Sequence, residues 1–213
     1  MTDQPSLNGL LKWGIENSVP NGTDGAAAPR NTTRGLDPEM LAQLLGGPSD
    51  ADRMRDAMSA IVAPVDQVDL ENKMIAWDNF EQMIENLDNA NNMDPLGLWP
   101  PLVQQLSNTE AEMRRMAAWC CSTAVQNNVK SQEKMLAAGG IKELARLSTT
   151  DDSVVVRKKA VTALSSAMRN FQPGMDELES VLPGSVWKRK GLDAADMDSV
   201  DELIGRLREG AAR

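Results

Sequence analysis

The chain has 213 residues, which is enough for one medium domain with flexible ends. Hydrophobic residues make up 41% of it but aromatic residues only 3%, with 13 Met and no Tyr, a composition that favours helix-on-helix packing over the Val- and Tyr-rich pattern of sheet proteins. Asp and Glu number 31 against 22 Lys and Arg, and the formal net charge of -9 argues against nucleic acid and anionic membranes as partners, because both are bound through clustered cations.

The first predicted element is an apolar motif within a flexible N-terminal segment, residues 1–36. Leu10, Leu11 and Trp13 belong to a short stretch with helical spacing of its apolar residues. The residues that follow are rich in Gly, Pro, Asn and Thr, and they cannot bury enough apolar surface to offset their chain entropy. We therefore expect them to act as a tether for the motif.

A brief helix is predicted over residues 37–44. Asp37 and Pro38 suit the N-cap and the first helical position, and Gly46-Gly47-Pro48 would end the helix. From about residue 50 the pattern changes to sustained helical periodicity, and we assign residues 37–172 to an array of repeats.

Three segments of this array align with one another: KMIAWDNFEQMIEN from Lys73, RRMAAWCCSTAVQN from Arg114 and RKKAVTALSSAMRN from Arg157, with starts 41 and 43 residues apart. Each segment opens with a base, carries apolar residues along one helical face and ends with Asn. A period of about 40–47 residues is typical of armadillo and HEAT arrays. The sequence therefore predicts an all-α, armadillo- or HEAT-like right-handed solenoid, with long helices near residues 70–88, 110–128 and 153–171.

Shorter helices are predicted between the long ones. LWPPLVQQLSN, from Leu98, matches GIKELARLSTT, from Gly140, in position and character. Each unit is then a short helix followed by a long one, and neither can bury its apolar face alone. Stacking of the units places the long helices along a concave surface, which such arrays use to bind partners.

The regular pattern fades after residue 172. Residues 173–213 are predicted to form an irregular tail, interrupted by Pro and Gly, with one amphipathic helix near residues 200–207 that caps the last repeat. The basic cluster Lys188-Arg189-Lys190 beside Trp187 is interpreted as a solvated part of this tail.

No catalytic residue, metal site or cofactor is expected. The chain has no His, and its two cysteines, Cys120 and Cys121, are adjacent, which suits neither a zinc site nor a disulfide. It lacks the phosphate-binding and nucleophile motifs of common enzymes and any run of about 20 apolar residues. Without a heptad seam, we also expect a monomer. These features predict a reduced, cytosolic protein that is not an enzyme.

Three strings resemble one protein family: LLKWGIENS near the N-terminus, DNFEQMIENLDNANN over residues 78–92 and TAVQNNVKSQEKML over residues 123–136. They are similar to the armadillo-type nucleotide exchange factors of 70-kDa heat-shock chaperones, especially the fungal cytosolic branch. The resemblance implies a co-chaperone whose concave face wraps one lobe of the chaperone's nucleotide-binding domain and favours the open cleft, so that ADP leaves. It also implies that the N-terminal motif of Leu10, Leu11 and Trp13 helps to release substrate; the alternative is that the motif docks on the array itself. Family members often carry at least one further armadillo unit, whereas the pattern here ends near residue 172.

The predicted partner-binding residues fall into three groups. Positions off the packed stripe of the long helices are Asp78, Gln82, Trp119, Thr123, Thr162 and Ser166. The basic openers are Lys73, Arg114 and Arg157, which suit an acidic chaperone lobe or, alternatively, are solvated helix ends or partners in internal ion pairs with Asp and Glu. The string shared with the family adds Asp88, Asn89, Ala90 and Asn91. Trp119 has two interpretations, an exposed interface anchor or a partly buried packing residue.

An armadillo adaptor of the nuclear-import type is the alternative hypothesis. Such adaptors hold an extended basic peptide with repeated Trp and Asn on successive concave helices. Trp119 has no counterpart at the aligned positions Asp78 and Thr162, so the sequence does not supply that array. A non-specific scaffold would require the family strings to be coincidental.

Overall fold

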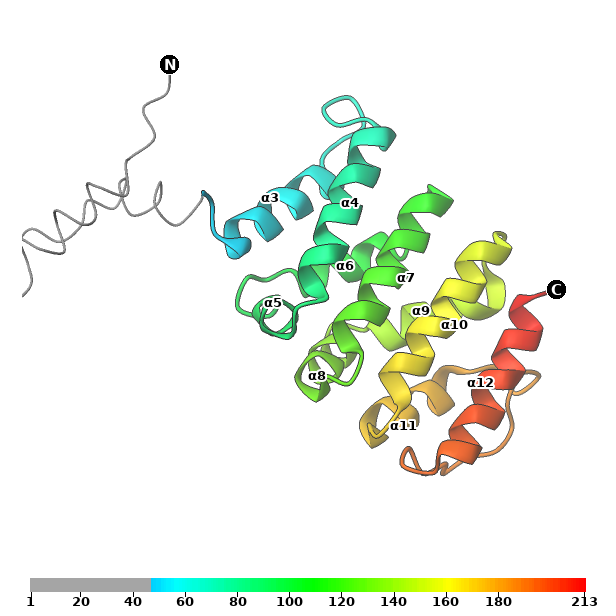
Figure 1. Ribbon diagram of the computed structural model, residues 1–213. Coiled ribbons are helices and arrows are strands. Elements are labelled where there is room, and N and C mark those ends of the chain that lie inside the picture. Colours follow the sequence, from blue (N-terminus) through cyan, green and yellow to red (C-terminus); the bar gives the residue numbers. More distant parts are fainter. Residues whose placement is uncertain (1–46) are drawn as a thin grey trace, which may run out of the picture. The chain divides into compact units, whose positions relative to one another are not determined.

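The computed structural model describes residues 47–213, and residues 50–213 form a compact unit. Ten helices and no strand lie in this described part (Figure 1). The helices are α3 (Asp50–Val62), α4 (Leu70–Ile84), α5 (Leu87–Asn92), α6 (Trp99–Gln105), α7 (Ala111–Val125), α8 (Val129–Ala137), α9 (Gly140–Thr150), α10 (Val154–Met168), α11 (Gln172–Val181) and α12 (Met197–Ala211). The predicted all-helical repeat array is confirmed. The flexible segment 1–36 and the brief helix over residues 37–44 lie outside the described residues.

The long helices form one layer of the array. In Figure 1, α4, α7, α10 and α12 lie side by side in chain order, and each packs on the next. They begin 41, 43 and 43 residues apart. Two shorter helices, α6 and α9, lie behind this row, whereas α5, α8 and α11 lie at its lower end in the figure. The repeat period of the sequence is thus the spacing from one long helix to the next.

Each long helix buries the stripe that the repeat alignment assigns to it. The positions three, seven and eleven residues after the basic opener lie on one side of a helix. These positions are buried in every aligned copy. They are Ala76, Phe80 and Ile84 in α4, Ala117, Cys121 and Val125 in α7, and Ala160, Leu164 and Met168 in α10. These stripes join in a single hydrophobic core that runs through the stacked units.

The Asn that closes each aligned segment ends the long helix in one of two ways. Asn127 and Asn170 follow α7 and α10 with φ of 53° and 55°. Asn tolerates this left-handed region better than most residues with a side chain. Asn86, after α4, instead caps α5, where its Oδ1 accepts hydrogen bonds from the backbone N–H groups of Asp88 and Asn89.

Residues 173–213 contain two helices, whereas the sequence pattern indicated one. The additional helix is α11, which starts at Gln172 with Pro173 in its first turn and packs on α9. Proline is tolerated there because the first helical N–H groups have no intrahelical partner. Pro173 therefore begins a helix and does not interrupt one.

The second of these helices, α12, occupies the place of a fourth long helix. It is longer than the predicted capping helix and packs on both α10 and α9. Its buried Leu203, Leu207 and Ala211 stand three, seven and eleven residues after Val200, as in the other long helices. Val200 replaces the basic opener and Arg213 replaces the closing Asn, which explains why the alignment missed this helix.

The segment between α11 and α12 is also fixed to the array. Trp187, Leu192 and Ala194 are buried. The carboxylate of Glu179 on α11 accepts hydrogen bonds from the backbone N–H groups of Gly191, at 2.7 Å, and of Leu192, at 3.2 Å. The solvated character predicted for the basic cluster 188–190 agrees with the exposure of all three side chains.

We expect Leu203→Ala to lower the free energy of unfolding by about 2–5 kcal/mol, because it leaves a cavity in the core beneath α12. Urea denaturation followed by circular dichroism measures the change. Arg208→Ala, at an exposed position of the same helix, is the control and should change stability by no more than about 0.5 kcal/mol. Equal stability of the two variants would contradict the place of α12 in the core.

Candidate partner-binding face

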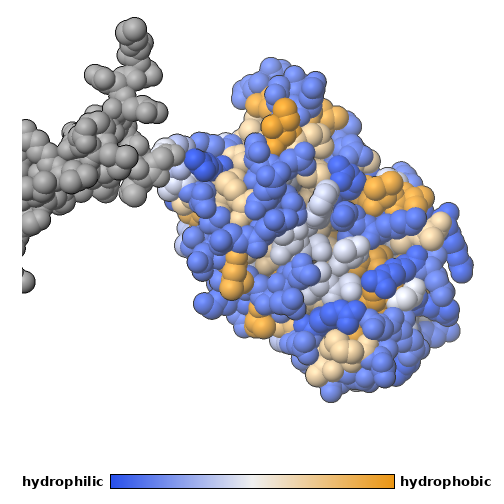
Figure 2. Space-filling view, in the orientation of Figure 1, coloured by the Kyte–Doolittle hydropathy of each residue, from blue (hydrophilic) through white to orange (hydrophobic). Residues whose placement is uncertain are grey.

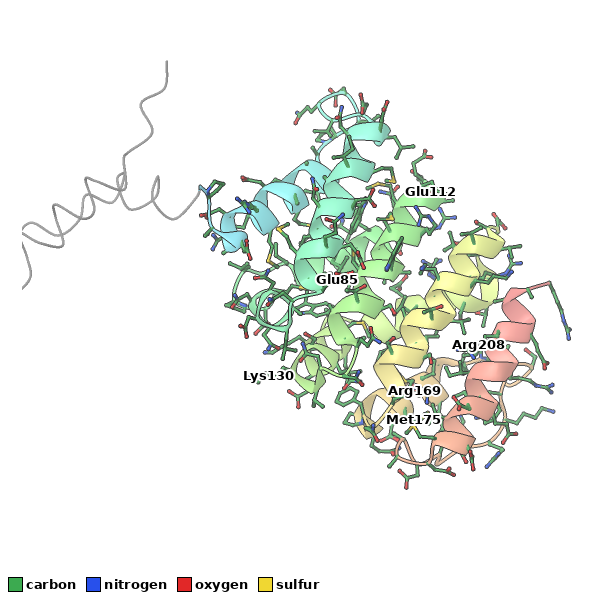
Figure 3. All side chains as sticks on the ribbon, viewed as in Figure 1. Glu85, Glu112, Lys130, Arg169, Met175 and Arg208 are labelled. Atoms are coloured by element: carbon green, nitrogen blue, oxygen red, sulfur yellow. The ribbon has the colours of Figure 1, made fainter. Side chains whose placement is uncertain are left out.

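Polar side chains bridge three neighbouring long helices on the layer that faces the viewer in Figure 3, where Glu85, Glu112 and Arg169 mark α4, α7 and the end of α10. We call this surface of α4, α7 and α10 the long-helix face. Thr123 Oγ1 on α7 donates a hydrogen bond of 2.7 Å to Glu81 Oε1 on α4. Figure 2 shows weakly polar side chains gathered in the middle of this view, flanked by hydrophilic ones.

A second bridge joins α7 to α10 on the long-helix face. The hydroxyl oxygens of Ser122 and Ser166 lie 3.1 Å apart and share a hydrogen bond. Small hydroxyl side chains at these positions allow the two helices to approach closely while their polar atoms stay paired. The face is therefore preorganised by contacts between its own helices.

Trp119 lies half-buried on α7 between two cations. Lys159 Nζ from α10 is 4.1 Å from the ring centroid, and Arg115 Cζ is 5.9 Å from it, both within the range of cation–π attraction. Arg115 Nε also donates to Glu112 Oε2 at 2.8 Å. Burial and the charge of Arg115 lower the pKa of Lys159, and the carboxylate of Glu81 opposes them. Trp119 is partly buried against the core, as its packing interpretation predicts, and its role as an interface anchor stays a prediction.

The other predicted positions on the long helices differ in exposure. Asp78, Gln82 and Thr162 are exposed, whereas Thr123 and Ser166 are half-buried in the two hydrogen-bonded bridges. Gln82 lines a groove of about 460 Å³ between α3 and α4, together with Arg53, Asp56, Ala57, Ala76, Asn79 and Met83. The alignment thus identified the surface layer of these helices but not the grooves within it.

The three basic openers turn back toward the chain that precedes their own helix. Lys73 is buried, with 6% of the residue exposed, and its Nζ donates to the Ala63 carbonyl oxygen. In the same way, Arg114 Nη1 donates to the carbonyl oxygens of Asn108 and Thr109. Arg157 Nη1 donates to the carbonyl oxygens of Asp151 and Asp152. A cation in the first turn of α4, of α7 and of α10 therefore anchors the preceding turn.

Arg114 also forms a bidentate ion pair with Asp151, whose side chain is almost entirely buried. The Nε–Oδ2 distance is 2.6 Å and the Nη2–Oδ1 distance is 3.0 Å. Burial of Asp151 would raise its pKa, but the hydrogen bonds from Arg114 and from the Ser153 N–H outweigh it and hold the pKa below its usual value. We therefore assign the openers a structural role in place of the predicted row of partner contacts.

The string shared with the family is mostly structural as well. Asp88 is exposed, but the Asn89 amide is buried and donates to Asp50 Oδ2 at 3.1 Å and to the Met83 carbonyl at 3.0 Å. Ala90 is 3% exposed, and its carbonyl oxygen accepts from Ser131 Oγ on α8 at 3.4 Å. A large side chain at Ala90 would therefore overpack the junction of α5 and α8 as well as alter the nearby surface.

A small pocket of about 140 Å³ opens beside Ala90, between α5 and α8. Its lining residues include Asn91 and Trp99, and the Oδ1 atom of Asn91 and the Nε1 atom of Trp99 are buried without a hydrogen-bond partner among residues 47–213. An unpaired buried donor and acceptor are each costly, so these two atoms are exceptions among the buried polar groups of the described residues. Sequence reasoning missed Trp99, because the prolines after it pointed only to a helix start.

The remaining expectations concern chemistry and the N-terminus. Cys120 and Cys121 are buried, and burial raises the pKa of Cys121 to about 12 and that of Cys120 well above its usual value. Residues 47–213 contain no cluster of three metal-ligating side chains and no helix long and apolar enough to cross a membrane. The substrate-release residues Leu10, Leu11 and Trp13 lie outside the described residues.

Two layers of stacked helical units, with a bridged surface on the long helices, define an armadillo-type repeat protein. Solved structures agree on this fold. A designed armadillo repeat protein in complex with the peptide (KR)4 has a TM-score of 0.54 at 18% identity and covers 75% of this chain and 70% of its own. An engineered protein has a TM-score of 0.55 at 19% identity, over 81% and 70% of the two chains.

Sequence comparison then identifies the family. Residues 7–93 match the family described as Nucleotide exchange factor Fes1, and residues 89–178 match the SIL1/FES1/HPBP1 C-terminal domain. A Gibberella zeae protein named Hsp70 nucleotide exchange factor FES1 is 52% identical over 96% of both chains, and a Coccidioides immitis protein of the same name is 51% identical over 95% of this chain and 97% of its own. The chain belongs to the Fes1 family of nucleotide exchange factors.

The Arg114–Asp151 pair predicts a pH dependence of stability. Because the pKa of Asp151 is lowered by folding, the stabilisation is complete above its unfolded value, about 3.9, and is lost as the pH falls through the lower folded value. Asp151→Asn should lower the free energy of unfolding by about 3 kcal/mol at neutral pH. The difference in stability between this variant and the wild type should shrink below about pH 4. Urea denaturation of both proteins across this pH range measures the difference in free energy of unfolding. Asp152→Asn, at the exposed neighbour, should show no such difference.

Proposed function

We propose that this protein is a cytosolic co-chaperone that binds the nucleotide-binding domain of a 70-kDa heat-shock chaperone and promotes release of ADP. The observation that carries the proposal is the match, over 96% of both chains, to a relative named Hsp70 nucleotide exchange factor FES1. We assign binding to the long-helix face, with the exposed side chains of Asp78, Gln82 and Thr162 and the half-buried Trp119.

The exchange activity follows from differential binding. A rigid partner that fits the open nucleotide cleft better than the closed one shifts the chaperone toward the open state, from which ADP dissociates. Stacked helices bridged by the Thr123–Glu81 and Ser122–Ser166 contacts supply such rigidity. The proposed mechanism depends on differential binding alone and uses no catalytic residue, cofactor or metal ion, and we propose that the protein acts as a monomer.

Relatives of different lengths carry the exchange-factor name. This chain matches 98% of the length of a relative from Neurospora crassa. It matches only 59% of the length of a relative from Yarrowia lipolytica, which is 48% identical over 82% of this chain. Family members of both lengths therefore carry the same exchange-factor name. In this chain, α12 takes the place of a fourth long helix and packs on α10.

The nuclear-import type of adaptor receives no further support. Asp78 and Thr162 lie at the positions where its repeated Trp would stand, and Trp119 is held by cations that would repel a basic peptide.

The proposal predicts that the wild-type protein accelerates release of a fluorescent ADP analogue from a cytosolic 70-kDa heat-shock chaperone. Thr162→Arg should reduce the apparent affinity about tenfold or more, because a bulky charge would stand within the contact surface. Thr150→Arg is the matched control. Both threonines are exposed and donate from Oγ1 to the carbonyl four residues earlier, but Thr150 lies on α9. No acceleration by the wild type would refute the function, and equal loss in both variants would refute the assigned face.

The N-terminal motif gives a separate prediction. Deletion of residues 1–35 should leave ADP release unchanged and slow the release of a bound substrate polypeptide from the chaperone, because Leu10, Leu11 and Trp13 would no longer compete for its apolar binding site. A fluorescent peptide released from the chaperone measures this step. The control is Leu10→Ser with Leu11→Ser in the full chain, which should reproduce the deletion; unchanged release in both would contradict the role of the motif.

A further inference from the structure

The long-helix face gathers two positive charges around one aromatic ring. Lys159 reaches Trp119 from α10, and Arg115 reaches it from one turn earlier on α7. The ring attracts each cation, but the cations repel each other, and burial adds to the cost of charge on Lys159. The lowered pKa of Lys159 agrees with this geometry.

The acidic side chains of this region are largely engaged elsewhere. Glu112 pairs with Arg115, and Glu81 is buried and accepts the hydrogen bond from Thr123. Lys159 forms no ion pair with any carboxylate among residues 47–213. What distinguishes Lys159 is that it lies over an aromatic ring that a second cation, Arg115, also approaches.

Other cations do not offer the same opportunity near the centre of the face. The donors of Lys73, Arg114 and Arg157 are directed to backbone carbonyls and to Asp151, inside the array. Arg169, at the end of α10, pairs with Asp201 of α12. Arg115 and Lys159 are thus the cations that converge on an aromatic side chain at the surface.

We propose that Arg115, Trp119 and Lys159 form an acid-accepting anchor, in which a Glu or Asp side chain of the chaperone's nucleotide-binding domain lies beside Trp119 and pairs with Lys159 and Arg115. This inference rests on the proposed function and specifies the chemistry of its contact. A carboxylate there would relieve the repulsion between the two cations and form charge-assisted hydrogen bonds with both. The indole ring would exclude water from the pair and strengthen it.

The anchor replaces the predicted row of basic openers as the electrostatic contact with an acidic partner. The openers are spaced one repeat apart along the array, whereas the anchor draws on two adjacent helices, α7 and α10. Recognition should therefore depend on one local acidic residue and not on a distributed acidic surface. This difference makes the two arrangements separable by single substitutions.

The test measures binding of the full-length protein to a cytosolic 70-kDa heat-shock chaperone by titration calorimetry across a range of salt. Lys159→Gln should weaken binding about tenfold and flatten its salt dependence, and Lys159→Glu should weaken it further, because it repels the incoming carboxylate. Lys159→Arg keeps the charge and should retain most of the affinity. The matched control is Lys142→Gln, at an exposed lysine of α9.

The outcomes separate the anchor from the function that it serves. If the wild type binds and releases ADP but Lys159→Gln and Lys159→Glu bind equally well, the anchor is refuted and the proposed function stands. If the wild type does not bind, the proposed function is refuted and the anchor with it. Thermal unfolding of each variant detects misfolding, and Lys159→Gln then decides the question if Lys159→Glu does not fold.

Discussion

Burial of one apolar stripe per long helix against the next helix is the constraint on which the array depends. A stripe such as Ala160, Leu164 and Met168 is too narrow to form a core within its own unit, and it is removed from water only when a neighbouring unit covers it. Each unit therefore needs another on both sides or a helix that ends the series. The place of α12 beside α10 follows from this need.

The same constraint explains the construction of the exposed layer. Once the stripes face inward, the opposite side of each long helix must meet its neighbours through residues that tolerate water. Threonine, serine and tryptophan do so here, in contacts that cross from helix to helix. Packing of the stripes therefore determines which side of each long helix a partner can reach. The chemistry of that side is set by the side chains that do not take part in the core.

Much of the fold could be predicted because it is periodic. Spacing of apolar residues within Lys73 to Asn86, and its recurrence, was enough to identify the helices and their buried faces. The fourth long helix was missed because it shares the apolar spacing but not the basic opener, which belongs to a different interaction. Likewise, Ala90 was predicted at the surface from a matched string, but matching strings do not separate residues that contact a partner from residues that support the fold.

The candidate site was less predictable, because it depends on distances between units. Nothing along the chain indicates that Lys159 lies over Trp119, since the two residues are 40 positions apart and meet only after two units stack. The same holds for the unpaired atoms of Asn91 and Trp99 in their pocket. Sequence periodicity specifies which side of a helix is exposed, whereas the neighbours on that side are set by the stacking geometry.

Asp151 has a mechanical consequence for the array. Its carboxylate holds Arg114 at the start of α7, its carbonyl oxygen holds Arg157 of α10, and the same carboxylate caps the turn into α10 through the Ser153 N–H. One residue thus fastens two successive units at the same end. Bending between α7 and α10 at this end must stretch both Arg114–Asp151 hydrogen bonds, while the contacts of Asp151 with Ser153 and Arg157 keep the turn before α10 from yielding, so this joint resists a change in the curvature of the array.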